Sequence, residues 1–423
     1  MHIMKRLLIE RLGHRGEGVA RDGDARVFVP YALAGETVLA DVEGEQARLA
    51  EIVDASPDRI APICPHYAHC GGCAVQALRA PAYADWKRGL VETALRNAGL
   101  SLPVGPLVDA HGAGRRRVTF HARMEEGRAR VGFMAARSHE LVEIDACPLL
   151  APELAGALPA ARAIARILAG RGKPLDLAMT ATLDGLDVEL RGAGPLEEHE
   201  TGALVAAAAA HDLARLTNHG RLVALRSQPY VMVGPARVPL PSGAFLQATQ
   251  AGEDALGALV LEATQGAKNV VDLFCGVGAF ALRLAGRARV SAFDNAAEAV
   301  DAMLAGARVT SGLKPLDGAA RDLFERPLTG PELAPFDAVV FDPPRAGAMA
   351  QATEIAKSKV RRVVAVSCSA QSFARDAAIL IKGGFETKKI TPVDQFRFSP
   401  HVEIVATFSR GDGQKRAKRS LLG

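Results

Sequence analysis

Residues 336–345 read FDAVVFDPPR and residues 362–369 read RVVAVSCS, and these two stretches decide the fold. Each is a short apolar run that ends in turn residues, which is typical of a buried parallel strand. In an open α/β sheet, ligands bind beyond the carboxyl ends of such strands. We therefore expect the acid Asp342 and the thiol Cys368 to face one crevice, as a cofactor-binding acid and a nucleophile.

A nucleotide-type cofactor is indicated by the sequence that precedes these strands. Residues 270–280, VVDLFCGVGAF, predict a strand, a glycine turn that lets a ligand approach the backbone, and a helix start. The glycine spacing falls short of the full dinucleotide fingerprint. Asp294 ends the next strand, where an acid can hold ribose hydroxyls, and Asp322 follows the third strand, where it is expected near an adenine ring. Together with the Asp-Pro-Pro turn at Asp342, this pattern favours S-adenosylmethionine over NAD.

Four cysteines predict a metal site. Three of them lie in residues 64–73, CPHYAHCGGC, and the fourth, Cys147, lies far along the chain. Thiolates select zinc or iron–sulfur clusters, and the spacing alone leaves both open. His66 and His69 are expected to be loop residues, although either can replace a cysteine as a ligand. Such a site would tie two distant segments together.

The N-terminal residues 1–56 predict a small all-β barrel. They contain short alternating strands separated by glycine and proline turns. Such a barrel is either a structural cap or a nucleic-acid reader, and oligonucleotide-binding barrels are the commoner case.

The remaining chain divides into a middle region and a catalytic region. Residues 57–240 predict an α+β domain, and its basic run at 114–123, GRRRVTFHAR, is either a solvated edge or a means of neutralising phosphates. Residues 241–410 predict an α/β domain. Residues 411–423 predict a basic flexible tail that contacts RNA weakly.

Composition limits the possible function classes. A chain of 423 residues suggests about two or three domains. A hydrophobic content of 49% with 23% charged residues is that of a globular protein, and a net charge of +4 permits a nucleic-acid partner without requiring one. We find no signal-peptide pattern and no apolar run of about 18 residues, so we expect a cytoplasmic protein without a membrane partner.

Several motifs resemble the RNA uracil-5-methyltransferase family, which is class I and uses S-adenosylmethionine. They are residues 272–278 (DLFCGVG), 342–347 (DPPRAG), Ser367-Cys368 and 401–403 (HVE). With the cysteine cluster and an N-terminal segment that is similar to a TRAM domain, the chain resembles the 23S ribosomal RNA branch over nearly its whole length. The resemblance implies a TRAM-like barrel, a central α+β domain with a [4Fe-4S] cluster and a Rossmann-like methyltransferase domain.

The resemblance also implies a mechanism and a set of site residues. Carbon 5 of uracil is a poor nucleophile, and a thiolate that adds to carbon 6 makes an enolate that accepts a methyl group. A general base must then remove the carbon 5 proton. Cys368 matches the nucleophile and Glu403 the base. The cofactor-site residues are Gln247, Phe274, Asp294 and Asp342, with Asp322 added from the strand pattern, and the cluster ligands are Cys64, Cys70, Cys73 and Cys147.

Other functions remain open at this point. The same reaction on transfer RNA is one, and a non-catalytic iron–sulfur RNA-binding protein is another, although it leaves Cys368 and Glu403 unexplained. An amino-group methyltransferase usually has an aromatic residue after Asp-Pro-Pro, where this chain has Arg345. The family commonly has Asn-Pro after the nucleophile, and Ser369-Ala370 here loosens the loop expected to hold the target base. RNA is the one partner we expect, and the sequence implies no protein partner.

Overall fold

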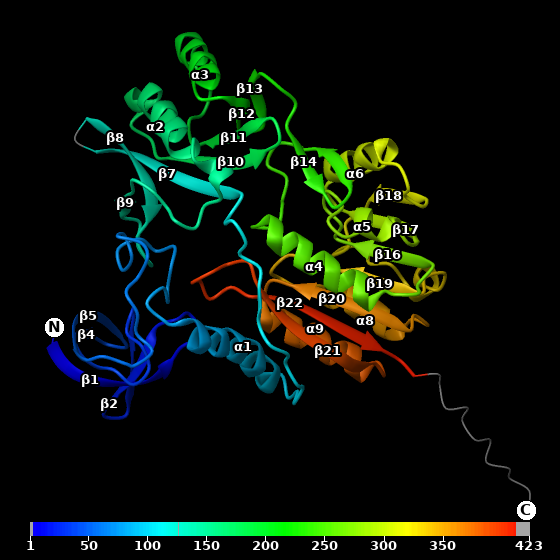
Figure 1. The fold of residues 1–423 in the computed structure, drawn as a ribbon, viewed down its shortest axis with the longest axis horizontal. Coiled ribbons are helices and arrows are strands. Elements are labelled where there is room, and N and C mark those ends of the chain that lie inside the picture. The colour runs from blue at the N-terminus through cyan, green and yellow to red at the C-terminus, as the bar shows by residue number, and fades with distance from the viewer. Residues whose placement is uncertain (1–2, 126, 412–423) are drawn as a thin grey trace, which may run out of the picture.

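The computed structural model describes residues 3–125 and 127–411, which form several domains (Figure 1). The first is a closed five-stranded barrel with the strand order β1-β2-β3-β5-β4. Its strands are β1 (Ile3–Leu12), β2 (Gly18–Asp22), β3 (Ala25–Val29), β4 (Thr37–Glu43) and β5 (Gln46–Asp54). Alternate side chains such as Val27, Val29 and Val38 fill the barrel interior, so the expected small barrel is confirmed.

Two elements between the barrel and the central sheet pack on the catalytic domain. They are α1 (Ala80–Asn97) and the short strand β6 (Val108–Asp109). Val91 and Leu95 of α1 lie in the same core cluster as residues of the catalytic sheet, and β6 pairs in parallel with β21 at the edge of that sheet. The catalytic domain is therefore completed by a segment from the first quarter of the chain.

The central domain is a seven-stranded sheet with the order β13-β12-β11-β10-β7-β8-β9. Helices α2 and α3 share one core cluster with the apolar face of the sheet, which includes Phe120, Leu177 and Val188. The elements are β7 (Arg117–Glu125), β8 (Arg128–Met134), β9 (Leu141–Glu143), α2 (Ala157–Ile167), β10 (Leu175–Thr182), β11 (Gly185–Arg191), α3 (Glu198–Ala210), β12 (Leu213–Asn218) and β13 (Arg221–Leu225). Strands β10 and β11 form an antiparallel hairpin.

The catalytic domain is an eight-stranded α/β sheet with the order β18-β17-β16-β19-β20-β22-β21-β6. Its strands are β16 (Asn269–Leu273), β17 (Arg289–Asp294), β18 (Leu316–Ala320), β19 (Ala338–Phe341), β20 (Arg362–Ser367), β21 (Glu386–Asp394) and β22 (Glu403–Ser409). All neighbouring strands from β18 to β20 run parallel, whereas β22 runs antiparallel to β20 and to β21. The strand order changes direction between β16 and β19, which is where such sheets bind ligands.

Helices cover both faces of this sheet. They are α4 (Gln250–Ala263), α5 (Ala281–Ala285), α6 (Ala297–Val309), α7 (Gly330–Leu333), α8 (Met349–Lys357) and α9 (Ala370–Lys382), and a hairpin of β14 (Tyr230–Val233) and β15 (Ala236–Pro239) precedes them. Alternate residues of each strand enter separate cores: Val270 packs with α4, α5 and α6, and Val271 packs with α1, α8 and α9. Strands buried on both faces explain the continuous apolar runs in the sequence.

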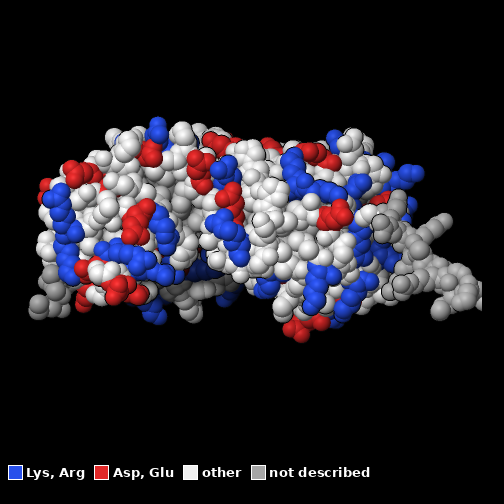
Figure 2. Space-filling model, turned by 90° about the horizontal axis from the view of Figure 1, so that it is seen from below, with Lys and Arg blue, Asp and Glu red and all other residues white. Residues whose placement is uncertain are grey.

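Charges of both signs are interspersed on the face of the molecule seen in Figure 2. This distribution agrees with the small net charge of +4. Within the described residues, no helix combines the length and the apolar character needed to cross a membrane. The predicted basic tail lies, apart from Gly411, outside the described residues.

Candidate active site and cysteine pocket

The turn after β16 is built for close approach of a ligand. Phe274 has a φ of 64° and Gly278 has a φ of 95°, so the backbone makes a left-handed turn here. A Cβ atom on Gly278 would lie 2.5 Å from Cγ of Met303, which explains why glycine is needed. The Gly276 N–H donates to Oδ2 of Asp294 at 2.8 Å, so the acid at the end of β17 holds the turn in place.

A cavity of about 690 Å³ lies at the carboxyl ends of these strands. It brings together six residues that the sequence predicted for the site: Gln247, Phe274, Asp294, Asp342, Cys368 and Glu403. The expectation that Asp342 and Cys368 face one crevice is therefore confirmed. We call this cavity the catalytic pocket.

The structure does not place Asp322 among the residues that line the catalytic pocket. Its Oδ1 accepts hydrogen bonds from the backbone N–H groups of Phe324 at 2.9 Å and Glu325 at 3.2 Å. The neighbouring Phe324 does line the pocket, and its ring lies 5.5 Å from that of Phe274. Asp322 therefore shapes the turn that carries an aromatic wall of the pocket.

A chain of hydrogen bonds connects the acids of the catalytic pocket. Nε2 of Gln247 donates to Oδ2 of Asp342 at 3.2 Å. Nε2 of Gln395 donates both to Oε1 of Gln247 at 2.6 Å and to Oε1 of Glu403 at 3.1 Å. The two amides thereby hold the carboxyl groups of β19 and β22 in fixed positions.

Burial and mutual repulsion shift the titration of these groups. Burial raises the pKa of Asp342 to about 7, and the Gln247 hydrogen bond opposes this shift. Burial and the Asp342 charge raise the pKa of Glu403 to about 8. Burial, followed by the charges of Glu403 and Asp342, raises the pKa of Cys368 to about 11, whereas Arg345 opposes it. The pocket thus resists the accumulation of negative charge.

Arg345 is a cation that lines the catalytic pocket with these acids. The exposed Arg345 lies with its Nη2 3.1 Å from Nε2 of His401. Burial, followed by the charge of Arg345, lowers the pKa of His401 to about 4. The imidazole is therefore neutral at physiological pH and accepts the hydrogen bond of the guanidinium.

Two buried polar residues of this region were not among the sequence-predicted site residues. Gln395 joins the acids as described above, and it follows β21 without any motif that marks it. Asp272 lies inside β16, fully buried, and neither carboxyl oxygen meets hydrogen-bond geometry with any described residue. Burial raises its pKa, the Asp342 charge adds to the rise, and the nearby Ala281 N–H offsets only part of it. A polar residue inside an apolar strand was the available signal for Asp272.

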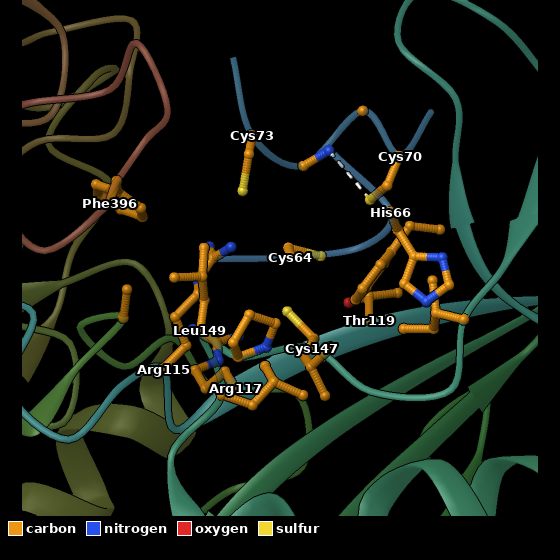
Figure 3. A pocket seen from close by; sticks show the side chains of 18 of the residues that line it. Cys64, His66, Cys70, Cys73, Arg115, Arg117, Thr119, Cys147, Leu149 and Phe396 are labelled. Atoms are coloured by element: carbon orange, nitrogen blue, oxygen red, sulfur yellow. Dashed lines mark hydrogen bonds between the residues drawn. The ribbon is translucent and has the colours of Figure 1, made fainter. Parts of the chain in front are cut away.

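The four predicted metal ligands line a second cavity, of about 540 Å³, which we call the cysteine pocket. In Figure 3 the side chains of Cys64, Cys70, Cys73 and Cys147 point into this cavity. Burial raises the pKa of Cys73 to about 12, and the other three thiols add to the rise. The thiols are therefore close enough to interact electrostatically.

The cysteine pocket has soft sulfur donors of the type that metal clusters use. Within the described part of the chain, no three His, Cys, Asp or Glu side chains are grouped as the ligands of a metal ion are. The residue types fit a thiolate site, but their arrangement does not show one, and the [4Fe-4S] cluster stays a prediction.

The two pockets adjoin each other. Phe245, Leu246 and Phe396 line both of them. The guanidinium of Arg115 lies 5.6 Å from the Phe396 ring, and Nη1 of Arg117 donates to the Leu246 carbonyl at 2.9 Å. Arg115 and Arg117 of the basic run thus line the cysteine pocket beside the shared wall rather than a solvated edge.

Comparisons with known proteins identify the family. A protein of Brucella suis named as an uncharacterised RNA methyltransferase is 44% identical over 405 residues, covering 96% of this chain and 98% of its own. The chain belongs to the RNA methyltransferase family. The 23S rRNA (uracil(1939)-C(5))-methyltransferase RlmD of Shewanella amazonensis is 31% identical over 422 residues, covering 95% of both chains. No family model matches the chain.

A solved structure extends the likeness to the fold of the whole chain. The tRNA (uracil-54, C5)-methyltransferase of Pyrococcus abyssi, in complex with S-adenosyl-L-homocysteine, superposes with a TM-score of 0.73 at 20% identity. The match covers 95% of this chain and 99% of that protein. This chain therefore shares its multidomain fold with the Pyrococcus abyssi protein.

Proposed function

We propose that this RNA methyltransferase uses S-adenosylmethionine to methylate carbon 5 of a uridine in 23S ribosomal RNA. The observation that carries the proposal is the single pocket in which the Cys368 thiol faces the carboxyl groups of Glu403 and Asp342. The name of the 31% identical RlmD relative supports uracil carbon 5 and 23S RNA as the target.

The catalytic pocket fits the methyl donor, which supplies an electrophilic methyl group on a cationic sulfonium. The glycine turn at Gly276 and the Asp294 carboxylate suit the ribose side of the molecule, and Phe274 with Phe324 suits the adenine ring. Asp342 lines the pocket and is hydrogen-bonded by an amide rather than by a cation, so a cationic ligand would stabilise its ionised form.

Cys368 acts as the nucleophile in this proposal. After its proton leaves for solvent, the thiolate sulfur bonds to carbon 6 of the uracil, and the electron pair of the carbon 5–carbon 6 bond becomes available at carbon 5 for methylation. Arg345 favours the thiolate, because its positive charge opposes the rise in the pKa of Cys368. The target base must leave its stack to reach the thiol, at a cost of about a few kcal/mol.

Glu403 acts as the general base that completes the reaction. Its carboxylate takes the proton from carbon 5, the electron pair of that bond re-forms the double bond, and the thiolate of Cys368 leaves carbon 6. Each turnover releases one proton, which Glu403 passes to solvent. The Gln395 amide holds the carboxylate in position for this transfer.

We further infer that Cys64, Cys70, Cys73 and Cys147 hold a [4Fe-4S] cluster. The four thiols line one cavity, and thiolates are the usual ligands of such clusters. Arg115 and Arg117 line the same cavity and would balance the negative charge of the thiolates. A cytoplasmic location and a weak RNA contact by the basic tail, residues 411–423, belong to the same proposal.

The test is methyl transfer from labelled S-adenosylmethionine to 23S and transfer RNA transcripts, with the wild-type protein beside Cys368→Ala. We expect label on 23S RNA that the variant cannot transfer, although it unfolds at the wild-type temperature. Label on transfer RNA alone would overturn the substrate and keep the mechanism. Absence of label on both RNAs would overturn the enzymatic proposal in favour of an RNA-binding role.

A further inference from the structure

A fully buried lysine lies behind the catalytic pocket. Lys87 of α1 has no exposed surface. Its Nζ donates to Oδ1 of Asp394 at 2.8 Å, to the Phe396 carbonyl at 3.3 Å and to the His401 carbonyl. An ammonium has three N–H donors, so every one of them is used. These acceptors all belong to the loop between β21 and β22, at residues 395–402, or to its first flanking residue.

A second residue of α1 holds the same loop. The hydroxyl of Tyr83 donates to Oδ2 of Asp394 at 2.5 Å and accepts from the Phe398 N–H at 2.9 Å. Asp394 also accepts from the Phe396 N–H at 3.1 Å. Lys87 and Tyr83, one helical turn apart, thereby hold the start, the middle and the end of the loop.

The loop held by α1 carries part of the catalytic pocket. Gln395 at its start bonds the Glu403 carboxyl, and His401 near its end lies against Arg345. Glu403 is the first residue of β22, directly after the loop. Any displacement of the loop would therefore move the proposed base relative to Cys368.

Stability alone does not explain a buried ion pair at this position. Replacing such a pair with well-packed apolar residues is often neutral or stabilising, because desolvation offsets the attraction. Burial lowers the pKa of Lys87, and the charges of Asp394 and Glu403 oppose that shift, so the ammonium depends on these acids. We therefore explain the Lys87–Asp394 pair by its effect on the position of the loop and on the charge of nearby groups.

We propose that Lys87 is a positioning residue for the methyl-transfer reaction: its ammonium fixes the 395–402 loop and favours the carboxylate form of Glu403. This inference rests on the proposed function. Glu403 shares the pocket with Asp342 and Arg345 from the end of β19, His401 from the loop and the Cys368 thiol that follows β20, and Gln395 bonds it. Lys87 of α1 acts on it through its charge, from a hydrogen bond to the carbonyl of His401, two residues away in sequence. Lys87 and Arg345 are the cations among them.

The first test compares Lys87→Met with Lys389→Met. Methionine keeps the length of the side chain and removes the charge, and Lys389 is an exposed lysine of β21 that pairs with Glu262 far from the loop. Without the Lys87 charge, the pKa of Glu403 rises further. We expect the acid limb of the pH–rate profile for methyl transfer to move up by roughly 0.5–1 pH unit in Lys87→Met alone. A uniform loss of rate without this shift would overturn the electrostatic part of the proposal.

The second test needs no activity. Trypsin cleaves after Arg397, an exposed residue of the loop. We expect this cleavage to be at least about tenfold faster in Lys87→Met than in the wild type or Lys389→Met, since loss of the buried contacts releases the loop. Tyr83→Phe keeps the charge and removes one tether, so it should speed cleavage without moving the pH limb, and it serves if Lys87→Met does not fold.

The outcomes of the two tests separate the inference from the proposed function. Unchanged cleavage after Arg397 in both variants would overturn the anchoring role. Faster cleavage in a protein whose wild type methylates no RNA would support the anchoring role and overturn the proposed function.

Discussion

The catalytic pocket and the cysteine pocket adjoin each other but differ in the charged and titratable groups that line them. The catalytic pocket gathers carboxyl groups, and burial raises the pKa of Asp342 to about 7 and that of Glu403 to about 8. The cysteine pocket gathers thiols beside Arg115 and Arg117. The catalytic pocket therefore suits a cationic ligand, whereas the cysteine pocket already contains two cationic side chains beside its thiols.

The two pockets are separated by a wall that they share. Phe245, Leu246 and Phe396 form the shared wall, and none of them carries a charge. An apolar wall does not screen charges on one side from the acids on the other, because a low dielectric strengthens electrostatic interactions. Arg115, which lies over the Phe396 ring, supplies the compensating charge at the partition.

The largest effect should come from Glu403→Gln in the catalytic pocket. The amide cannot accept the carbon 5 proton, so we expect turnover to fall about 10²- to 10⁴-fold. The RNA should remain joined to Cys368 as a denaturation-resistant adduct, detected by gel electrophoresis. Glu386→Gln, an exposed residue of the adjacent β21, should form no such adduct and keep full activity. A slow variant without an adduct would contradict the covalent mechanism.

The next effect should come from Cys73→Ser in the cysteine pocket. We expect the variant to lose most of its bound metal and to unfold at a lower temperature, because metal binding contributes to folding. Metal analysis of the purified wild type should give iron and sulfide, and Cys368→Ser should retain both in full. Zinc in place of iron in the wild type would refute the cluster while leaving the thiolate site intact.

A smaller effect concerns stability and pH. The raised pKa of Asp342, about 7 in the fold, means that its contribution to stability is present below the unfolded pKa of about 4 and is lost as pH rises through about 7. We expect the unfolding free energy of the wild type to fall relative to that of Asp342→Asn between about pH 5 and 7, by an amount on the order of a few kcal/mol that is measured as a lower Tm.

Asp337→Asn is the matched control for this measurement. Backbone N–H groups of Asn269 and Lys268 lower the pKa of Asp337. Its contribution to stability is therefore present above its unfolded pKa and is already complete at pH 5. If the Tm difference between the wild type and Asp342→Asn does not change with pH, Asp342 is not buried as a neutral acid.

The smallest contrast is between two acids at strand ends. Asp294 lines the catalytic pocket and Asp322 does not. Loss of a charged hydrogen-bond acceptor costs about 1.5–3 kcal/mol, so Asp294→Asn should raise the KM for S-adenosylmethionine by at least about tenfold. Asp322→Asn should raise it less than about threefold. Equal effects would place Asp322 in contact with the cofactor after all.

The residues at the ends of strands were the part of the site that the sequence predicted best. Asp342 and Cys368 follow apolar runs whose length and turn residues mark parallel strands, so their shared location could be predicted. Asp322 also follows a strand, but the sequence does not reveal that its carboxyl group turns back to bond two backbone N–H groups of its own turn. The position of a residue at a strand end predicts that it lies near the site. The direction of its side chain can be read only from the folded structure.

Long-range contacts were the least readable part. Gln395 takes its place because Lys87 and Tyr83, more than 300 residues away in sequence, hold the loop beside it. The sequence of α1 does not show that this helix packs on the catalytic sheet. No local pattern records which surface a helix covers, so the loop contacts could not be foreseen.

The edge strand β6 and helix α1 carry a consequence for how the chain folds. They occupy residues 80–109, yet their partners in β21 and in the 395–402 loop are synthesised last. Contacts of such high sequence separation form slowly, and domains fold as units during synthesis. The barrel and the central sheet can therefore fold during synthesis of the chain. The apolar side of α1 stays exposed until the C-terminal strands are made. The catalytic pocket forms only after the C-terminal strands are synthesised, so a prematurely ended chain retains the barrel and the central sheet without a formed active site.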